Sequence, residues 1–138
     1  SVSNNPNLYF ILHGPEDVLK RLVNRRRRLK NCVKIVNSTD VISMSDKPSQ
    51  VVRSGKNSSM WSALECVKNG EADVCVSCGN TGALMAMAKF VLKTLPGIDR
   101  PAIATHFPTS KGKSLMLDLG ANLECDAQNL VQFAVMGI

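Results

Sequence analysis

The chain has few aromatic residues, no long apolar run and no regular cysteine framework. Aromatic side chains make up 4% of its 138 residues, which argues against the stacking surfaces that bind single-stranded nucleic acids. No apolar run is long enough to cross a bilayer, and no signal-peptide pattern is present. Neither the Walker pattern nor the dinucleotide pattern G-x-G-x-x-G occurs. With 44% apolar residues, the composition instead agrees with a soluble, intracellular α/β protein.

The five cysteines are an odd number without regular spacing, which favours a reducing compartment over a disulfide scaffold. Cys75-x-x-Cys78 invites a zinc or redox interpretation. However, residues three apart on a strand point to opposite faces, and the other cysteines and histidines show no finger-like pairing. We therefore expect no metal and no cofactor.

The net charge is +6, and four consecutive arginines, Arg25–Arg28, contribute much of it. A basic patch raises nucleic-acid binding as an alternative function, because such patches attract phosphate backbones. An expected helix over Pro15–Lys30 places Arg25, Arg27 and Arg28 opposite Leu22 and Leu29. A solvated helix face explains the cluster more simply, so no nucleic-acid partner is predicted.

Apolar periodicities alternate between strand and helix along the chain, which is typical of a parallel sheet with crossover helices. Expected strands are Leu8–Leu12, Val33–Val36, Ala72–Val76 and Leu115–Leu119. Expected helices are Pro15–Lys30, Pro48–Arg53, Ser59–Asn69, Ala83–Leu92 and an unfinished one over Leu130–Met136.

The segment Ser77–Ala83 joins an expected strand to an expected helix through small polar residues. Gly79 and Gly82 tolerate positive φ and close approach of a ligand, while Asn80 and Thr81 can cap the helix. The first turn of a helix leaves N–H groups unpaired, so a phosphate or carboxylate is a natural occupant. A tight strand-to-helix turn without a ligand is the alternative.

A second polar segment, Lys111–Ser114, leads into the expected strand that contains Asp118. A carboxylate within a buried strand is costly unless it is paired, so we expect Lys111 or Lys113 to be its partner. The alternative is a solvated turn at Lys111–Lys113. Open α/β sheets bind ligands at the carboxyl ends of their strands, and two such polar sites therefore favour a ligand-binding function.

Together these residues resemble a known family, the bacterial phosphate acyltransferases usually called PlsX. The resemblance runs in order over nearly all of the chain after Tyr9, and S-x-G-N-T-G-A with L-D-L-G-A-N is distinctive in combination. Its segments are Lys47–Arg53, Asn57–Met60, Val76–Met85, Arg100–Ala102, Lys111–Lys113 and Leu117–Asn122. Cys78 departs from the family, because alanine is expected there in many relatives.

The resemblance implies an enzyme that transfers a long-chain acyl group from acyl carrier protein to inorganic phosphate, giving acyl phosphate for phospholipid synthesis. It implies a three-layer α/β/α sandwich with a largely parallel sheet, like isocitrate and isopropylmalate dehydrogenases and phosphotransacetylases. A cytoplasmic homodimer is expected. Peripheral attachment to the inner face of the membrane and contact with a downstream glycerol-3-phosphate acyltransferase are left open.

The chemistry of this reaction suggests roles for the two polar segments. Phosphate is expected to bind Ser77, Gly79, Asn80, Thr81 and Gly82. Lys111 or Lys113 would neutralise charge, and Asp118 and Asn122 would orient the nucleophile or donate to the oxyanion. Lys47, Ser49, Arg53 and Ser58–Met60 would border the substrate cleft, and the basic surface could steer the acidic carrier protein.

Family members are more than twice as long and begin with a strand followed by a D-x-M-G-G-D loop. This chain starts at Ser1 without methionine and stops at Ile138 after an apolar run. We therefore expect a fragment, with residues 1–138 forming a single incomplete α/β domain. Two enzyme alternatives remain: acetyl or butyryl transfer between phosphate and coenzyme A, and a metal-dependent dehydrogenase, for which an acidic cluster is missing.

Overall fold

The computed structural model describes residues 7–120, 122 and 124–138. Ala121, which belongs to the predicted Leu117–Asn122 motif, lies outside the described residues. The chain divides into two compact units, residues 1–92 and residues 93–138. Each unit is described by itself. Among the described residues, no helix is long and apolar enough to span a membrane.

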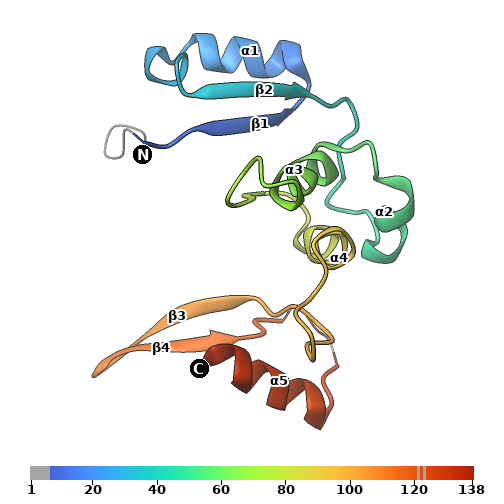
Figure 1. Cartoon of the computed structure of the whole chain (residues 1–138), viewed down its shortest axis with the longest axis vertical. Helices are drawn as coiled ribbons and strands as arrows, with labels where there is room; N and C mark the ends of the chain where they lie inside the picture. The colour runs from blue at the N-terminus through green and yellow to red at the C-terminus, as the bar shows by residue number, and fades with distance from the viewer. Residues whose placement is uncertain (1–6, 121, 123) are drawn as a thin grey trace. The chain divides into compact units, whose positions relative to one another are not determined.

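The first unit opens with a strand-helix-strand arrangement (Figure 1). Strand β1 (Phe10–Gly14) and strand β2 (Val33–Asn37) pair in parallel, with Phe10 opposite Val33 and Gly14 opposite Asn37. Helix α1 (Glu16–Asn24) connects them and packs along the same two-stranded sheet. These elements confirm the two predicted strands and the parallel pairing.

Helix α1 is shorter than predicted. It ends at Asn24, and a single 3-10 turn, η2 (Arg27–Leu29), follows. Arg26 between them is extended, with φ −124° and ψ 90°. Cations three and four residues apart on one helix repel each other, so a helix continued through Arg25–Arg28 would stack like charges. All four arginines are exposed, as the predicted solvated surface requires.

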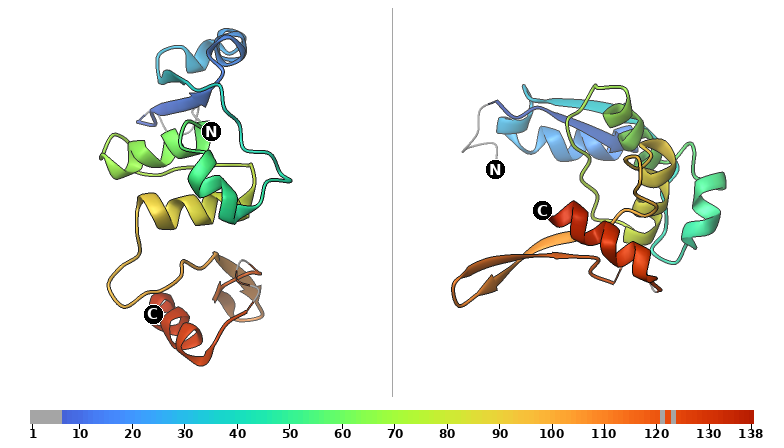
Figure 2. Two further views of the ribbon diagram at one scale, coloured as in Figure 1. Left: turned by 90° about the vertical axis from the view of Figure 1, so that its right-hand side faces the viewer. Right: turned by 60° about the horizontal axis from the view of Figure 1, so that its bottom comes forward.

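Three helices form the core of the first unit (Figure 2), and the last of them packs against the other two. They are α2 (Pro48–Ser54), α3 (Ser59–Lys68) and α4 (Thr81–Val91), close to their predicted bounds. The buried side chains are those of Val51, Met60, Trp61, Leu64, Ala83, Met87 and Val91. Gly70, at φ +74°, follows the end of α3, as predicted.

The predicted strand Ala72–Val76 does not form a strand. Among the described residues the segment joins no ladder, and Val74 and Val76 are 73% and 85% exposed. Strand pairing requires a neighbouring edge, and within residues 7–92 the sheet described for this unit consists of β1 and β2. The prediction of a strand at Ala72–Val76 is therefore wrong for the described residues, among which it has no pairing partner.

The second unit contains an antiparallel hairpin and one helix. Strands β3 (Ala104–Thr109) and β4 (Gly112–Leu117) pair with Ala104 opposite Leu117 and Thr109 opposite Gly112. Helix α5 (Ala127–Gly137) packs against β4. The chain is thus mixed α/β, with one parallel and one antiparallel strand pair among the described residues. The antiparallel pairing was not predicted, although a turn between two strands at Lys111–Lys113 was the alternative for this segment.

Candidate functional site

The turn before α4 is organised by the side chain of Asn80, which is 8% exposed. Its Oδ1 accepts a hydrogen bond from the backbone N–H of Ala83 at 3.0 Å, so Asn80 is the N-cap of α4. This confirms the predicted capping function.

The amide nitrogen of Asn80 also fastens a distant loop to α4. Asn80 Nδ2 donates to the backbone carbonyls of Ser43 (3.1 Å), Met44 (3.3 Å) and Asp46 (3.0 Å). The loop closes on itself, because Asp46 Oδ2 accepts from the N–H of Ser43 at 2.8 Å. Both N–H bonds of the amide are therefore committed to protein carbonyls. The prediction that Asn80 binds phosphate directly stays a prediction, and the geometry favours an indirect function.

Gly82 is required for close packing between two helices. A Cβ built on Gly82 would lie 2.8 Å from Cγ of Pro48, the first residue of α2. A Cβ on Gly79 would meet ordinary contacts, 3.4 Å from Met60 Cε and 3.5 Å from Ser77 Oγ. Neither glycine has a positive φ, so the tolerance of glycine for left-handed backbone is not used at these positions. Approach of Pro48 explains Gly82 instead.

Ser77 and Thr81 flank the turn. Ser77 Oγ accepts from the N–H of Gly79 at 3.2 Å, which tightens the segment before α4. Thr81 is exposed at the first helical position. Within the described residues, the N–H groups of Thr81 and Gly82 have no hydrogen-bond partner, as expected for the start of a helix. They give an anion two backbone donors and a neighbouring hydroxyl.

The residues predicted to border a cleft differ in their exposure. Lys47, Ser49 and Arg53 are exposed on and beside α2. Ser58 is fully buried as the N-cap of α3, where it accepts from the N–H of Trp61 and donates to the carbonyl of Gly55. The packing of Ser58 accounts for its presence without any substrate.

In the second unit, Asp118 and Asn122 contact each other directly. Asp118 Oδ1 accepts from Asn122 Nδ2 at 2.9 Å and from its backbone N–H at 3.2 Å. Cys125 Sγ donates to Asp118 Oδ2 at 3.5 Å, and desolvation followed by this hydrogen bond raises the pKa of the Cys125 thiol. Asp118 has φ +61°, a left-handed conformation that is uncommon outside glycine. The structure therefore joins two of the predicted catalytic residues in one small network.

The predicted pairing of Asp118 with Lys111 or Lys113 is wrong. Strand β4 ends at Leu117, so Asp118 is not a carboxylate inside a strand. Lys111 lies in the hairpin turn, and Lys113 is five residues from Asp118, roughly 17 Å along an extended strand. Asn122 and Cys125 satisfy the carboxylate in place of a lysine. Both lysines are exposed, as the alternative of a solvated turn proposed.

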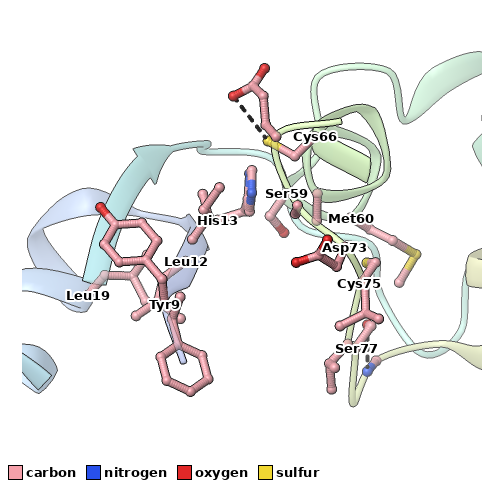
Figure 3. A pocket seen from close by; sticks show the side chains of 18 of the residues that line it. Tyr9, Leu12, His13, Leu19, Ser59, Met60, Cys66, Asp73, Cys75 and Ser77 are labelled. Carbon is pink, nitrogen blue, oxygen red and sulfur yellow. Dashed lines mark hydrogen bonds between the residues drawn. The ribbon is translucent and has the colours of Figure 1, made fainter. Parts of the chain in front are cut away.

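Sequence reasoning did not identify a groove of about 640 Å³ in the first unit. Its walls come from β1, from α3, from residues 71–77 and from Gly79 (Figure 3). His13, at the end of β1, has Nδ1 2.9 Å from Ser62 Oγ, and burial is the main reason that its pKa lies below 6.5. Within the described ranges, no three His, Cys, Asp or Glu side chains gather to hold a metal ion.

A family model described as fatty acid synthesis protein matches residues 1–138. The chain belongs to this family. Among curated relatives, the phosphate acyltransferase of Ruegeria pomeroyi is 56% identical over 99% of this chain, and that of Rhodospirillum centenum is 56% identical over 96%. The phosphate acyltransferase of Methylococcus capsulatus is 53% identical over 99%.

The family relatives are much longer than this chain. The matched region is 38% of the Ruegeria pomeroyi protein, 37% of the Rhodospirillum centenum protein and 41% of the Methylococcus capsulatus protein. The chain therefore spans about two fifths of their length, as expected for a fragment of a family member.

Proposed function

We propose that this chain is part of an enzyme that transfers a fatty acyl group to inorganic phosphate. The observation that carries the proposal is identity above 50% across nearly the whole chain to proteins named phosphate acyltransferase. The start of α4 supports it, because the N–H groups of Thr81 and Gly82 there have no hydrogen-bond partner in the part of the chain that the structure describes. The proposed donor is acyl carrier protein, and the product is acyl phosphate for phospholipid synthesis.

The proposed phosphate site is the turn Ser77–Gly82. Phosphate accepts hydrogen bonds from the N–H groups of Thr81 and Gly82 and from the Thr81 hydroxyl, while the positive end of α4 offsets its charge. Asn80 holds the turn in shape from behind through the Ser43–Asp46 carbonyls. The residue thus positions the site without touching the anion.

In the proposed reaction, a phosphate oxygen attacks the carbonyl carbon of the thioester. A tetrahedral oxyanion forms, the carbon–sulfur bond breaks, and the thiolate leaves with the electron pair. Such a step needs a positioned nucleophile and fixed donors to the oxyanion. Asn122 is the proposed donor, oriented by Asp118, and Lys111 and Lys113 are proposed to neutralise phosphate charge.

The resemblance further supports proposals about the architecture and assembly. These are a single incomplete α/β domain over residues 1–138, a three-layer α/β/α sandwich with a largely parallel sheet for the complete protein, a homodimer and a cytoplasmic location. Peripheral association with the membrane and contact with the glycerol-3-phosphate acyltransferase of the following step are proposed as well. None of these proposals involves a metal or a cofactor.

A chimera tests the activity with this chain's own residues. In it, residues 1–138 replace the matched region of the Ruegeria pomeroyi protein. Hydroxylamine traps acyl phosphate as a hydroxamate, so long-chain acyl carrier protein is incubated with and without inorganic phosphate. The expected result is phosphate-dependent hydroxamate from the chimera and the parent enzyme, but none from the chain alone.

Two variants of the chimera test the phosphate site. Thr81→Val removes a hydroxyl that is placed to bind the anion, so the KM for phosphate should rise about tenfold, equivalent to one lost hydrogen bond to a charged group. Ser54→Ala is the matched control, because the Ser54 hydroxyl donates only to Gln50 within its own helix. An active parent with an inactive chimera would reject the assignment for this chain, as would preference for coenzyme A thioesters over acyl carrier protein.

A further inference from the structure

The carboxylate of Asp118 is held at both of its oxygens. Its Oδ1 accepts from Asn122 Nδ2 at 2.9 Å, and its Oδ2 accepts from Cys125 Sγ at 3.5 Å. The backbone of Asp118 has φ +61°, and its N–H donates to the carbonyl of Ile103 at 2.8 Å. A left-handed aspartate is uncommon, and such conformations persist where surrounding contacts fix them, often at functional sites. Both the backbone and the side chain of Asp118 are therefore fixed.

The backbone on either side of Cys125 is anchored. On one side, Arg100 Nη1 donates to the carbonyl of Glu124 at 3.0 Å. On the other side, Asp126 caps α5: its Oδ1 accepts from the N–H of Asn129 at 2.8 Å, and its own N–H donates to Asn129 Oδ1 at 3.3 Å. Helix α5 in turn packs against β4. The thiol therefore reaches the carboxylate from a fixed stretch of backbone.

The surroundings of Cys125 favour the protonated thiol. Desolvation is the main reason that its pKa is raised, and the hydrogen bond to Asp118 raises the pKa further. The thiolate is the nucleophilic form of cysteine, so these surroundings disfavour a covalent acyl-cysteine intermediate. A protonated thiol still donates a hydrogen bond. The chemistry of Cys125 therefore fits the positioning of a carboxylate better than attack on a thioester.

We propose that Cys125 is a positioning residue for acyl transfer to phosphate, an inference that rests on the proposed function. The thiol fixes Asp118, and Asp118 fixes one N–H of the Asn122 side chain. The second N–H of that amide faces the carbonyl of Pro101, 3.3 Å from Nδ2. The bond to Pro101 is the longer of the two, so it is the one that the oxyanion replaces. Without the thiol, the Asn122 amide is held less firmly, and a loosely held donor stabilises an oxyanion poorly.

The kinetics of the chimera that carries residues 1–138 test this function. Cys125→Ala should lower kcat about tenfold and leave the KM for phosphate unchanged, because the lost contact acts only in the transition state. Cys125→Ser keeps an O–H donor and should restore most of the activity. Cys32→Ala is the matched control and should keep its kcat, since the Cys32 thiol donates at 3.5 and 3.6 Å to the backbone carbonyls of Arg28 and Leu29.

NMR relaxation of the Asn122 side-chain amide, measured on the chain itself, provides a readout apart from activity. In the unmodified chain the order parameter of this amide should be near 0.85, a value typical of rigid groups, written here as about 0.85. In Cys125→Ala it should fall below about 0.6, and in Cys125→Ser it should stay high. The urea midpoint of both variants should match that of the unmodified chain, which shows that the fold is kept.

The outcomes separate the function of Cys125 from the proposed activity. An inactive chimera beside an active parent would reject the activity, and the function of Cys125 with it. An active chimera in which Cys125→Ala keeps its kcat, or in which the Asn122 amide stays rigid, would overturn the positioning function alone. Loss of activity in Cys125→Ser to the level of Cys125→Ala would overturn it as well, because a nucleophilic cysteine, unlike a hydrogen-bond donor, is not replaced by serine.

Discussion

Replacing Asn80 tests whether its amide holds the Ser43–Asp46 loop against α4. Asn80→Ala removes the N-cap, which costs about 1 kcal/mol. It also removes two N–H donors that serve three carbonyls, and about 1 kcal/mol is lost for each donor. The expected loss in the free energy of unfolding is therefore about 3 kcal/mol.

Asn80→Asp separates the two contributions. The carboxylate still accepts from Ala83 and still caps α4, but it offers no N–H to the three carbonyls. We expect a loss of about 2 kcal/mol or more, because the anion also faces the carbonyl oxygens. Ser54→Ala is the control on an exposed helix position and should change stability by less than about 0.5 kcal/mol.

Urea denaturation followed by the fluorescence of Trp61 provides the measurement, since Trp61 is buried in the same core. A loss of about 1 kcal/mol for Asn80→Ala, with Asn80→Asp as stable as the unmodified chain, would refute the reasoning. The amide would then contribute nothing to loop attachment and would be free to bind phosphate.

Three further changes have defined outcomes. Gly82→Ala should cost about 1–3 kcal/mol in urea denaturation because its Cβ overlaps the proline that begins α2, whereas Gly79→Ala should be nearly neutral. Leu64→Ala should cost about 2–5 kcal/mol because Leu64 is 2% exposed, and Val76→Ala, at 85% exposure, should cost almost nothing. Burial lowers the pKa of His13 below its ordinary 6.5, so the unfolded chain takes up a proton at a higher pH than the folded chain does. The free energy of unfolding should therefore fall as the pH drops below 6.5, and His13→Gln should remove that part of the pH dependence.

Local patterns were sufficient to predict most elements of the first unit. Strands β1 and β2 are short apolar runs bounded by turn residues, and α3 and α4 follow helical periodicity from capping residues. The capping function of Asn80 could also be predicted from a local pattern, because an N-cap and its helix are adjacent in sequence.

Predictions that depended on a distant partner were less successful. The segment Ala72–Val76 has the composition of a strand, but a ladder needs an adjacent edge that no local pattern supplies. The pairing of Lys113 with Asp118 failed because the lysine lies along β4 while the carboxylate follows its end, where Asn122 is four residues away and closer.

The contrast between the two atoms of the Asn80 amide explains why the candidate site was only partly predictable. Its oxygen bonds Ala83, three residues away, whereas its nitrogen bonds carbonyls that lie 34–37 residues earlier in the chain. Sequence inspection detects the first contact and assigns the free nitrogen to a ligand. In the structure, the nitrogen instead attaches the loop that precedes α2, so the shape of the proposed phosphate turn depends on a segment outside its motif. Substitutions in Ser43–Asp46 should therefore alter phosphate affinity through the position of α4, without any contact to the anion.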